Sequence, residues 1–443
     1  MQHDPVSAGS GAATATAAPV SPAQRATARR AVVASSIGNA LEWFDIIVYA
    51  SLAVVISALF FPSAGGQGSV LGLLLTFGTF AVSYLIRPIG AMVLGSYADR
   101  QGRKKALTMT IGLMMLGTAL MAFAPTAQLI GPAAAVVILL SRLLQGFSAG
   151  GEFGTATAFL IENAPNRKAF YGSWQVATQG AAMLLASLFG LGLNTLISHD
   201  ALYSWGWRVP FLVGLLIGPV GLYIRLRMDE TPEFVAVAAG KVESSPLTQT
   251  LVHHAPRWLA ATATVGLASI SVYLILFMPT FAVSNLHLPS WAGYLGGIIS
   301  GIVSLVGCPL VGNLADRVGP ARVMTVAAVA AVVLAIPLFA LIVAVPTVAI
   351  LTLVQVVLGL LMAFYFGPLP ALLAAMFPTR IRTTGMSIAY NLGVTLFGGL
   401  APLFLTALIA GLGTLMAPGY YYAVVGVISL AGIIVCRRVF HQR

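Results

Sequence analysis

Long apolar runs alternate with short polar segments along almost the whole chain. An α-helix needs roughly 20 apolar residues to cross about 30 Å of hydrocarbon, and twelve runs of this kind can be read in the sequence. The predicted spans cover residues 31–60, 70–97, 106–124, 133–160, 171–197, 208–226, 257–284, 290–314, 322–343, 346–376, 383–410 and 418–436. The pattern predicts an all-α integral membrane protein with twelve transmembrane helices.

Composition supports the same class of protein. Of the 443 residues, 58% are hydrophobic and 8% are charged, and the mean hydropathy of +0.94 lies far above the range of soluble globular proteins. Cys308 and Cys436 both fall in predicted spans, so we expect neither a disulfide framework nor a cysteine metal site. Residues 1–29 are rich in Ala, Ser, Thr and Pro, which is typical of a disordered tail.

The net charge of +11 is distributed in a way that argues against nucleic-acid binding. Arg87 and Arg142 lie inside predicted spans and Arg208 lies at the start of one, whereas the other Lys and Arg residues fall in the tails or in alternate loops. This is the positive-inside pattern, and it predicts a bacterial-type inner-membrane protein with both termini in the cytoplasm. We interpret the following cations as topology signals only: Lys104, Lys105, Arg437 and Arg438.

The sequence contains an internal duplication. GSYADRQGRKKA, which begins at Gly95, is echoed by GNLADRVGPARV, which begins at Gly312, and PNRKAFYG is echoed by PTRIRTTG. Many secondary transporters are duplicated around a site at the membrane midplane, so we expect two pseudo-symmetric six-helix bundles. The predicted domains are a disordered cytoplasmic tail (1–29), a first bundle (30–226), a central cytoplasmic loop (227–256), a second bundle (257–437) and a short cytoplasmic tail (438–443).

These motifs resemble those of the major facilitator superfamily. The loop G-x-x-x-D-R-x-G-R-K-K after the second span is similar to the loop signature of that superfamily, and RLLQGFSAGGEFG, from Arg142, resembles its fourth-span motif. Four further segments resemble the metabolite:proton symporter branch: GNALEWFDIIVY, RPIGAMVLGSYADRQGRKKA, SWGWRVPF and RLRMDETPEF. FYGSWQVATQ and FPTRIRTTGMSIAYNLG look most like the citrate and tricarballylate proton symporters of that branch.

The resemblance implies the major facilitator fold and proton-coupled uptake of an organic anion, a tri- or dicarboxylate such as citrate, by alternating access. Sister transporters of 2-oxoglutarate, shikimate and betaine or proline share much of the scaffold, so these substrates stay open. A transporter-like membrane sensor is the alternative from a different class. No enzymatic motif is found. We therefore expect no enzyme, metal or cofactor, and a monomer whose partners are a small organic anion, the proton and the lipid bilayer.

Five charged residues are clear candidates for positions inside the membrane, and all belong to the first half. They are Glu42, Asp45, Arg87, Arg142 and Glu152. An ionised side chain at mid-bilayer costs roughly 2.5 to 3.5 kcal/mol, so such residues usually face a bundle interior and have partners. The interiors of the predicted spans in the second half contain no Asp, Glu, Lys, Arg or His. We therefore expect charge chemistry in the first half.

Proton coupling is predicted at the acids of the first span. The resemblance to proton-coupled sugar porters of the superfamily implies that Asp45 pairs with Arg142. A nearby arginine favours the charged form of an acid and burial favours the neutral form, so opening to either side would tip the balance. A static ion pair is the alternative. Glu42 is open as a second proton site, a substrate-side acid or a packing residue, and Glu152 as a relay or a structural residue.

Arg87 and Arg142 are the predicted cations of the substrate site, because guanidinium binds carboxylate through two parallel hydrogen bonds. A structural pairing is the alternative for Arg87. Neutral polar residues, most of them in stripes at helical spacing, complete the predicted substrate site: Tyr49, Gln175, Gln179, Tyr365, Tyr390 and Asn391.

The loop motifs are predicted to gate the cytoplasmic face through a charge cluster that breaks when that face opens. In the second copy a proline replaces Arg103 and no acid matches Glu162, so we expect a weaker latch there. The predicted gating residues are Gly95, Asp99, Arg100, Gly102, Arg103, Glu162, Arg167, Asp316, Arg317 and Arg380.

Overall fold

The computed structural model describes residues 22–62, 70–164, 166–227, 229–230, 234–235 and 246–442. Within these ranges every regular element is a helix. The predicted tail falls mostly on residues 1–21, outside the described residues, but the first helix already begins at Pro22, before the predicted boundary at residue 30. Ten of the described helices are long and apolar enough to cross a membrane.

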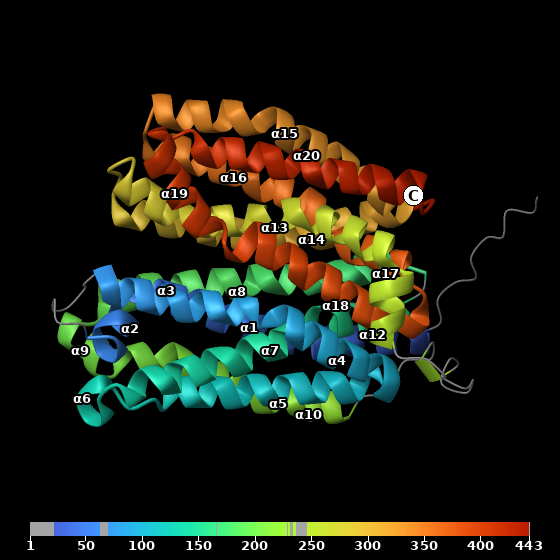
Figure 1. Cartoon of the computed structure of the whole chain (residues 1–443), viewed down its shortest axis with the longest axis horizontal. Coiled ribbons are helices and arrows are strands. Elements are labelled where there is room, and N and C mark those ends of the chain that lie inside the picture. Colours follow the sequence, from blue (N-terminus) through green and yellow to red (C-terminus); the bar gives the residue numbers. More distant parts are fainter. Residues whose placement is uncertain are drawn as a thin grey trace, which may run out of the picture.

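The first half of the chain forms one group of packed helices, blue to green in Figure 1. Its elements are α1 (Pro22–Ser51), α2 (Ala53–Phe60), α3 (Val70–Leu85), α4 (Arg87–Gln101), α5 (Arg103–Ala122), α6 (Ala127–Ile130), α7 (Ala133–Glu162), α8 (Lys168–Leu196), α9 (His199–Ser204), the 3₁₀ helix η1 (Gly206–Arg208) and α10 (Val209–Leu226). The predicted span 31–60 consists of α1 and α2.

The second half forms the other group, yellow to red in Figure 1. Between the halves lie α12 (Pro246–Thr248) and the π-helical η2 (Gln249–His253). The second half contains α13 (Ala255–Ser284), α14 (Ser290–Val318), α15 (Pro320–Ala344), α16 (Val348–Phe366), α17 (Leu369–Met376), the 3₁₀ helix η3 (Thr379–Ile381), α18 (Arg382–Gly393), the π-helical η4 (Val394–Gly399), α19 (Ala401–Leu412) and α20 (Ala417–Arg438). The predicted span 383–410 consists of α18, η4 and α19.

A proline explains where α3 and α4 meet. Pro88 has no N–H, so the carbonyl of Tyr84, one turn earlier, loses its usual helical donor. That carbonyl instead accepts a hydrogen bond of 3.1 Å from the hydroxyl of Thr395, in η4 of the second half. The interruption of the predicted span 70–97 therefore provides a contact between the halves.

The two halves pack most extensively along α8 and α14, which run side by side in Figure 1. Small residues permit this approach: a Cβ on Gly301 would lie only 2.8 Å from the carbonyl oxygen of Gly180. Helix α18 completes the contact by packing against α4 and α7.

The duplicated loop motif folds into the same turn twice. Gly102, between α4 and α5, and Gly319, between α14 and α15, both have φ of 105°, a conformation that favours glycine. Both turns lie at one end of the molecule, on the right in Figure 1. We call this end, where α4 meets α5 and α14 meets α15, the motif end.

Candidate functional site

Three carboxylates in the described interior of the first half each bind a guanidinium. All six side chains are buried. The pairs are Asp45–Arg142 (2.8 Å), Glu42–Arg87 (3.3 Å) and Glu152–Arg225. Each anion is therefore matched by a cation, which makes burial of so many charges tolerable.

Asp45 on α1 lies against Arg142 on α7. Arg142 Nη2 donates to Asp45 Oδ2 over 2.8 Å, and the hydroxyl of Thr118 lies 3.4 Å from Asp45 Oδ1. The guanidinium lies over the ring of Tyr49, 4.1 Å from its centroid, and Arg142 Nε has no hydrogen-bond acceptor. Two of the residues predicted for substrate binding, Tyr49 and Arg142, thus belong to the environment of the predicted proton site.

Glu42, one turn before Asp45, has a separate partner. Arg87 Nη2 lies 3.3 Å from Glu42 Oε1, and its guanidinium lies 4.4 Å from the ring centroid of Tyr84. The Tyr84 ring meets Tyr273 of the second half edge-on, at 5.6 Å between centroids. Arg87 Nε, like that of Arg142, has no acceptor. Arg87 is therefore paired with Glu42, which is the structural pairing considered as an alternative to substrate binding. It also lies beside the contact between the halves.

The third pair contains Arg225, which the sequence analysis grouped with the loop cations although it lies at the end of the predicted span 208–226. Arg225 lies in the last turn of α10, is buried, and binds Glu152 of α7, the carbonyl of Leu107 and the hydroxyl of Thr110. The expectation of only two cations inside the first half was wrong. A pattern was present in the sequence: Gly214, Gly218 and Gly221 form a buried stripe at helical spacing that leads to Arg225.

Gln175 takes part in hydrogen bonds that join α1 to α8. Asn39 Nδ2 donates to the hydroxyl of Thr178 (2.7 Å) and to the carbonyl of Gln175 (2.6 Å), and Gln175 Nε2 donates to Asn39 Oδ1 (3.0 Å). These amides hold α1 against α8 beside the carboxylates of α1.

The remaining predicted substrate residues are dispersed. Tyr365 donates to the carbonyl of Thr264 over 2.7 Å, a contact within the second half. Asn391 donates to the carbonyl of Gly150 over 2.7 Å, which ties α18 to α7, and the ring of Tyr390 stacks on Phe153 of α7. Only Tyr390 and Asn391 are therefore brought to the contact between the halves from the second half.

Gln179 lines a small cavity between the halves. Trp43, Met183 and Val272 also contribute to its wall, and its volume is about 10 Å³. A site of this size holds at most one water molecule. In this conformation the cavity beside Gln179 is closed to a carboxylate ligand.

Two aspartates at the motif end cap helices of the opposite half. Asp99 accepts hydrogen bonds from the N–H groups of Thr383 (3.3 Å) and Thr384 (2.8 Å), at the start of α18. Asp316 accepts from the N–H groups of Ala169 (2.8 Å) and Phe170 (2.9 Å), at the start of α8. A carboxylate at a helix N-terminus satisfies free N–H groups and favours the helix dipole. The duplicated motif therefore joins the two halves twice at the motif end, once in each direction.

The first of these contacts is reinforced by a buried charge cluster. Arg103 lies 3.0 Å from Asp99 and 3.2 Å from Glu162, and Arg382 of the second half lies 3.0 Å from Glu162. Asp99 is buried whereas Asp316 is exposed. The greater exposure of Asp316 is in line with the weaker latch expected for the second copy of the motif.

Arg382 was missed by the sequence analysis, which named Arg380 instead; Arg380 is exposed. Arg167, also predicted for the cluster, donates to Asn313 over 2.7 Å, and Arg100 and Arg317 are exposed.

Gly95 lets α18 approach α4, since a Cβ on it would lie 3.1 Å from the Cα of Thr384.

Comparison with known proteins agrees with this architecture. A model of the Major Facilitator Superfamily matches residues 36–402. The chain is 34% identical to a citrate-proton symporter of Salmonella typhi over 90% of the chain and 92% of the relative. It is 33% identical to a proline/betaine transporter of Salmonella typhimurium over 91% of the chain and 82% of that relative. A solved structure of the proton:xylose symporter XylE, bound to 6-bromo-6-deoxy-D-glucose, shares the fold with a TM-score of 0.75 at 16% identity, over 93% of this chain and 95% of that one.

Proposed function

Because the chain belongs to the major facilitator superfamily, we propose that it is a secondary active transporter that takes up an organic anion together with protons by alternating access. The proposed substrate is a tri- or dicarboxylate such as citrate, as the name of the citrate-proton symporter reported above suggests. The proton is the coupling ion. The observation that carries the proposal is the buried Asp45–Arg142 pair, a titratable acid and its cation on two helices of the first half.

The balance of buried charge supports coupling between proton and anion. In the described interior of the first half every carboxylate is matched by a guanidinium. A further anion would therefore enter a site without an uncompensated cation. Protonation of Glu42 or Asp45 releases Arg87 or Arg142 to bind substrate carboxylate through paired hydrogen bonds. Proton loading thus favours anion loading, which is the relation that symport requires.

A zwitterion is the second candidate substrate. Proline/betaine transporters are among the relatives, and two tyrosine rings already lie beneath guanidinium groups, Tyr49 under Arg142 and Tyr84 under Arg87. Aromatic faces also bind quaternary ammonium groups, and the acids could pair with the positive end of the ligand. Betaine would then need the charged forms of Glu42 and Asp45, opposite to citrate.

We place the motif end at the cytoplasmic side of a bacterial-type inner membrane, on the distribution of Lys and Arg. The reciprocal caps of Asp99 and Asp316 then close the cytoplasmic side in this conformation. A single chain supplies both halves of the path, so the monomer is the proposed functional unit.

Uptake of labelled citrate into proteoliposomes, with and without an imposed inward proton gradient, tests the proposal. We expect accumulation above equilibrium only with the gradient, and competition by tricarballylate and 2-oxoglutarate. Competition by betaine alone would favour the zwitterion. Saturable binding without transport would favour a sensor.

A further inference from the structure

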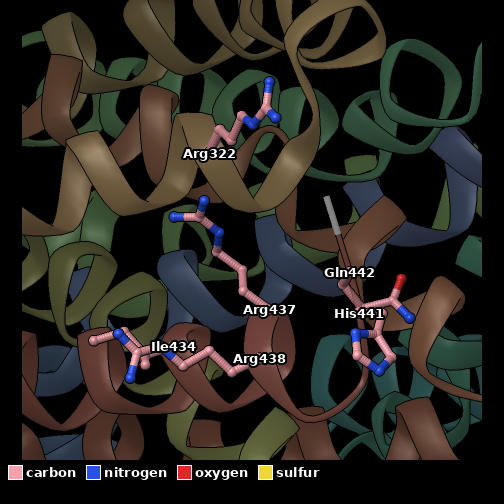
Figure 2. A pocket seen from close by; sticks show the side chains of 6 residues that line it. All are labelled: Arg322, Ile434, Arg437, Arg438, His441 and Gln442. Atoms are coloured by element: carbon pink, nitrogen blue, oxygen red, sulfur yellow. The ribbon is translucent and has the colours of Figure 1, made fainter.

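A basic pocket lies at the motif end, between the start of α15 and the end of α20 (Figure 2). Its volume is about 570 Å³. The lining consists of Arg322, Ile434, Arg437, Arg438, His441 and Gln442, without a carboxylate among these residues. The three arginines form no ion pair with any described residue. As far as the described residues go, the pocket thus concentrates positive charge that no carboxylate pairs.

The equivalent region of the first half contains its own anion. There Glu230, which follows α10, accepts hydrogen bonds from the backbone N–H groups of Arg103 (3.0 Å) and Lys104 (3.1 Å) at the start of α5. In the second half the chain after α20 brings His441 and Gln442 to this place. The amide of Gln442 donates to the carbonyl of Phe440 over 2.8 Å. Within the described chain, the duplicated structure therefore has a carboxylate in one copy and only neutral or basic groups in the other.

Apolar surface leads from the membrane-spanning parts of both helices to this pocket. On α15, Val326 and Val333 are 71% and 64% exposed, and Val326 lies one turn after Arg322. On α20, Val427 and Ile434 are also exposed, and Ile434 lies one turn before Arg438. A ligand in this position would contact hydrocarbon on one side and arginines on the other, which suits an amphiphile better than a small soluble anion.

We propose that this pocket binds the phosphate head group of an anionic lipid of the cytoplasmic leaflet, with the acyl chains along α15 and α20. Guanidinium groups bind phosphate oxygens through paired hydrogen bonds, and basic pockets between helices on the cytoplasmic side suit such head groups. The proposal uses the orientation given under Proposed function but not the identity of the transported substrate. The lipid would bridge α15 and α20, which pack against each other.

Native mass spectrometry of the full-length protein, incubated with equal amounts of phosphatidylglycerol and phosphatidylcholine, tests the proposal. The variant is Arg437→Gln/Arg438→Gln. Lys104→Gln/Lys105→Gln is the matched control, since it removes the same charge from the motif end outside the pocket. We expect the pocket variant to lose retained phosphatidylglycerol about tenfold and the control less than about twofold. Equal losses in both variants would overturn the proposal.

Two further measurements make the result specific. Arg322→Gln, on the opposite wall of the pocket, should reduce retention about threefold to fivefold, and wild-type retention would contradict a site shared by α15 and α20. Inorganic phosphate is added in excess as the soluble alternative. Displacement of the lipid by phosphate at millimolar concentration would overturn the lipid assignment in favour of a free anion. Unchanged melting temperatures in lipid-free detergent show that the variants are folded.

Discussion

Glu42 and Asp45 lie within one turn of α1, yet each binds its own guanidinium on a different helix, Arg87 on α4 and Arg142 on α7. A movement of α4 relative to α7 would therefore change the two acids separately. The apolar run around the two acids predicted that they have buried partners. The resemblance to sugar porters predicted that Arg142 is the partner of Asp45. Arg87 as the partner of Glu42 could not be predicted, since sequence spacing shows which residues share a face but not which helices meet.

Asp45→Asn is expected to abolish accumulation of citrate driven by a proton gradient, because the amide cannot carry the proton. Exchange of internal for external citrate should be retained in part, since exchange needs no net proton movement. Both rates are measured in the same proteoliposome preparation. Gradient-driven accumulation at the wild-type level would exclude Asp45 as the coupling site.

Arg87→Gln alone leaves Glu42 buried without its cation, which is strongly destabilising. The double variant Glu42→Gln/Arg87→Gln removes both charges, so we expect a melting temperature near that of the wild type. We also expect citrate binding to weaken by about tenfold or more, because the paired hydrogen bonds of the guanidinium are lost. Calorimetric titration measures this affinity.

Glu42→Gln is the matched single variant, because it leaves Arg87 without its carboxylate at every pH. We expect it to lower the melting temperature in the absence of a bound anion and to keep Arg87 available to the substrate. Its citrate affinity should vary less with pH than that of the wild type. If the double variant bound citrate with wild-type affinity, the role of Arg87 would be purely structural.

At the scale of elements, apolar length predicted where spans occur but not how they are built. The runs 31–60, 70–97 and 383–410 each consist of more than one helix. Hydropathy does not report on backbone hydrogen bonds, and these depend on single residues such as Pro88, whose partner Thr395 lies in the other half. The glycines of α7 carry a clearer signal, because small residues at helical spacing indicate close packing.

Gly150→Ala tests that packing. A Cβ on Gly150 would overlap the carbonyl oxygen of Arg87 and lie 2.7 Å from the N of Ala91, so α4 would be pushed away from α7. We expect a loss of about 1 to 3 kcal/mol of stability, seen as a lower melting temperature in detergent. Gly112→Ala is the control, because its Cβ would meet no atom within 4 Å. Equal melting temperatures for the two variants would contradict the close crossing.

At the scale of the whole molecule, the internal repeat predicted two bundles and a gate at the loop motifs. The structure adds that the contacts of these motifs run across the halves: Asp99 caps α18, Asp316 caps α8, and Arg382 joins the cluster of Arg103 and Glu162. The sequence showed the charges but not which of two neighbouring arginines, Arg380 or Arg382, turns inward. That choice depends on the short helix η3 and the first turn of α18.

Arg382→Gln is expected to favour opening of the motif end, because Glu162 loses the cation that the second half contributes. The reporter is Ser387→Cys on α18, in a background without the two native cysteines. Labelling of this thiol from the motif end should become about fivefold faster. Arg380→Gln removes the same charge from an exposed position on η3 and should leave the rate unchanged. Similar rates in both variants would show that the cluster does not hold the gate closed.

The exchanged caps of Asp99 and Asp316 have a consequence for the origin of the fold. Each half contributes the same aspartate and receives the same kind of cap, so the contact has the symmetry of a two-fold dimer. An ancestor of one six-helix bundle could have closed by this contact with a second copy of itself, before gene fusion joined the copies. Halves expressed as separate chains from one cell should accordingly find each other at the motif end.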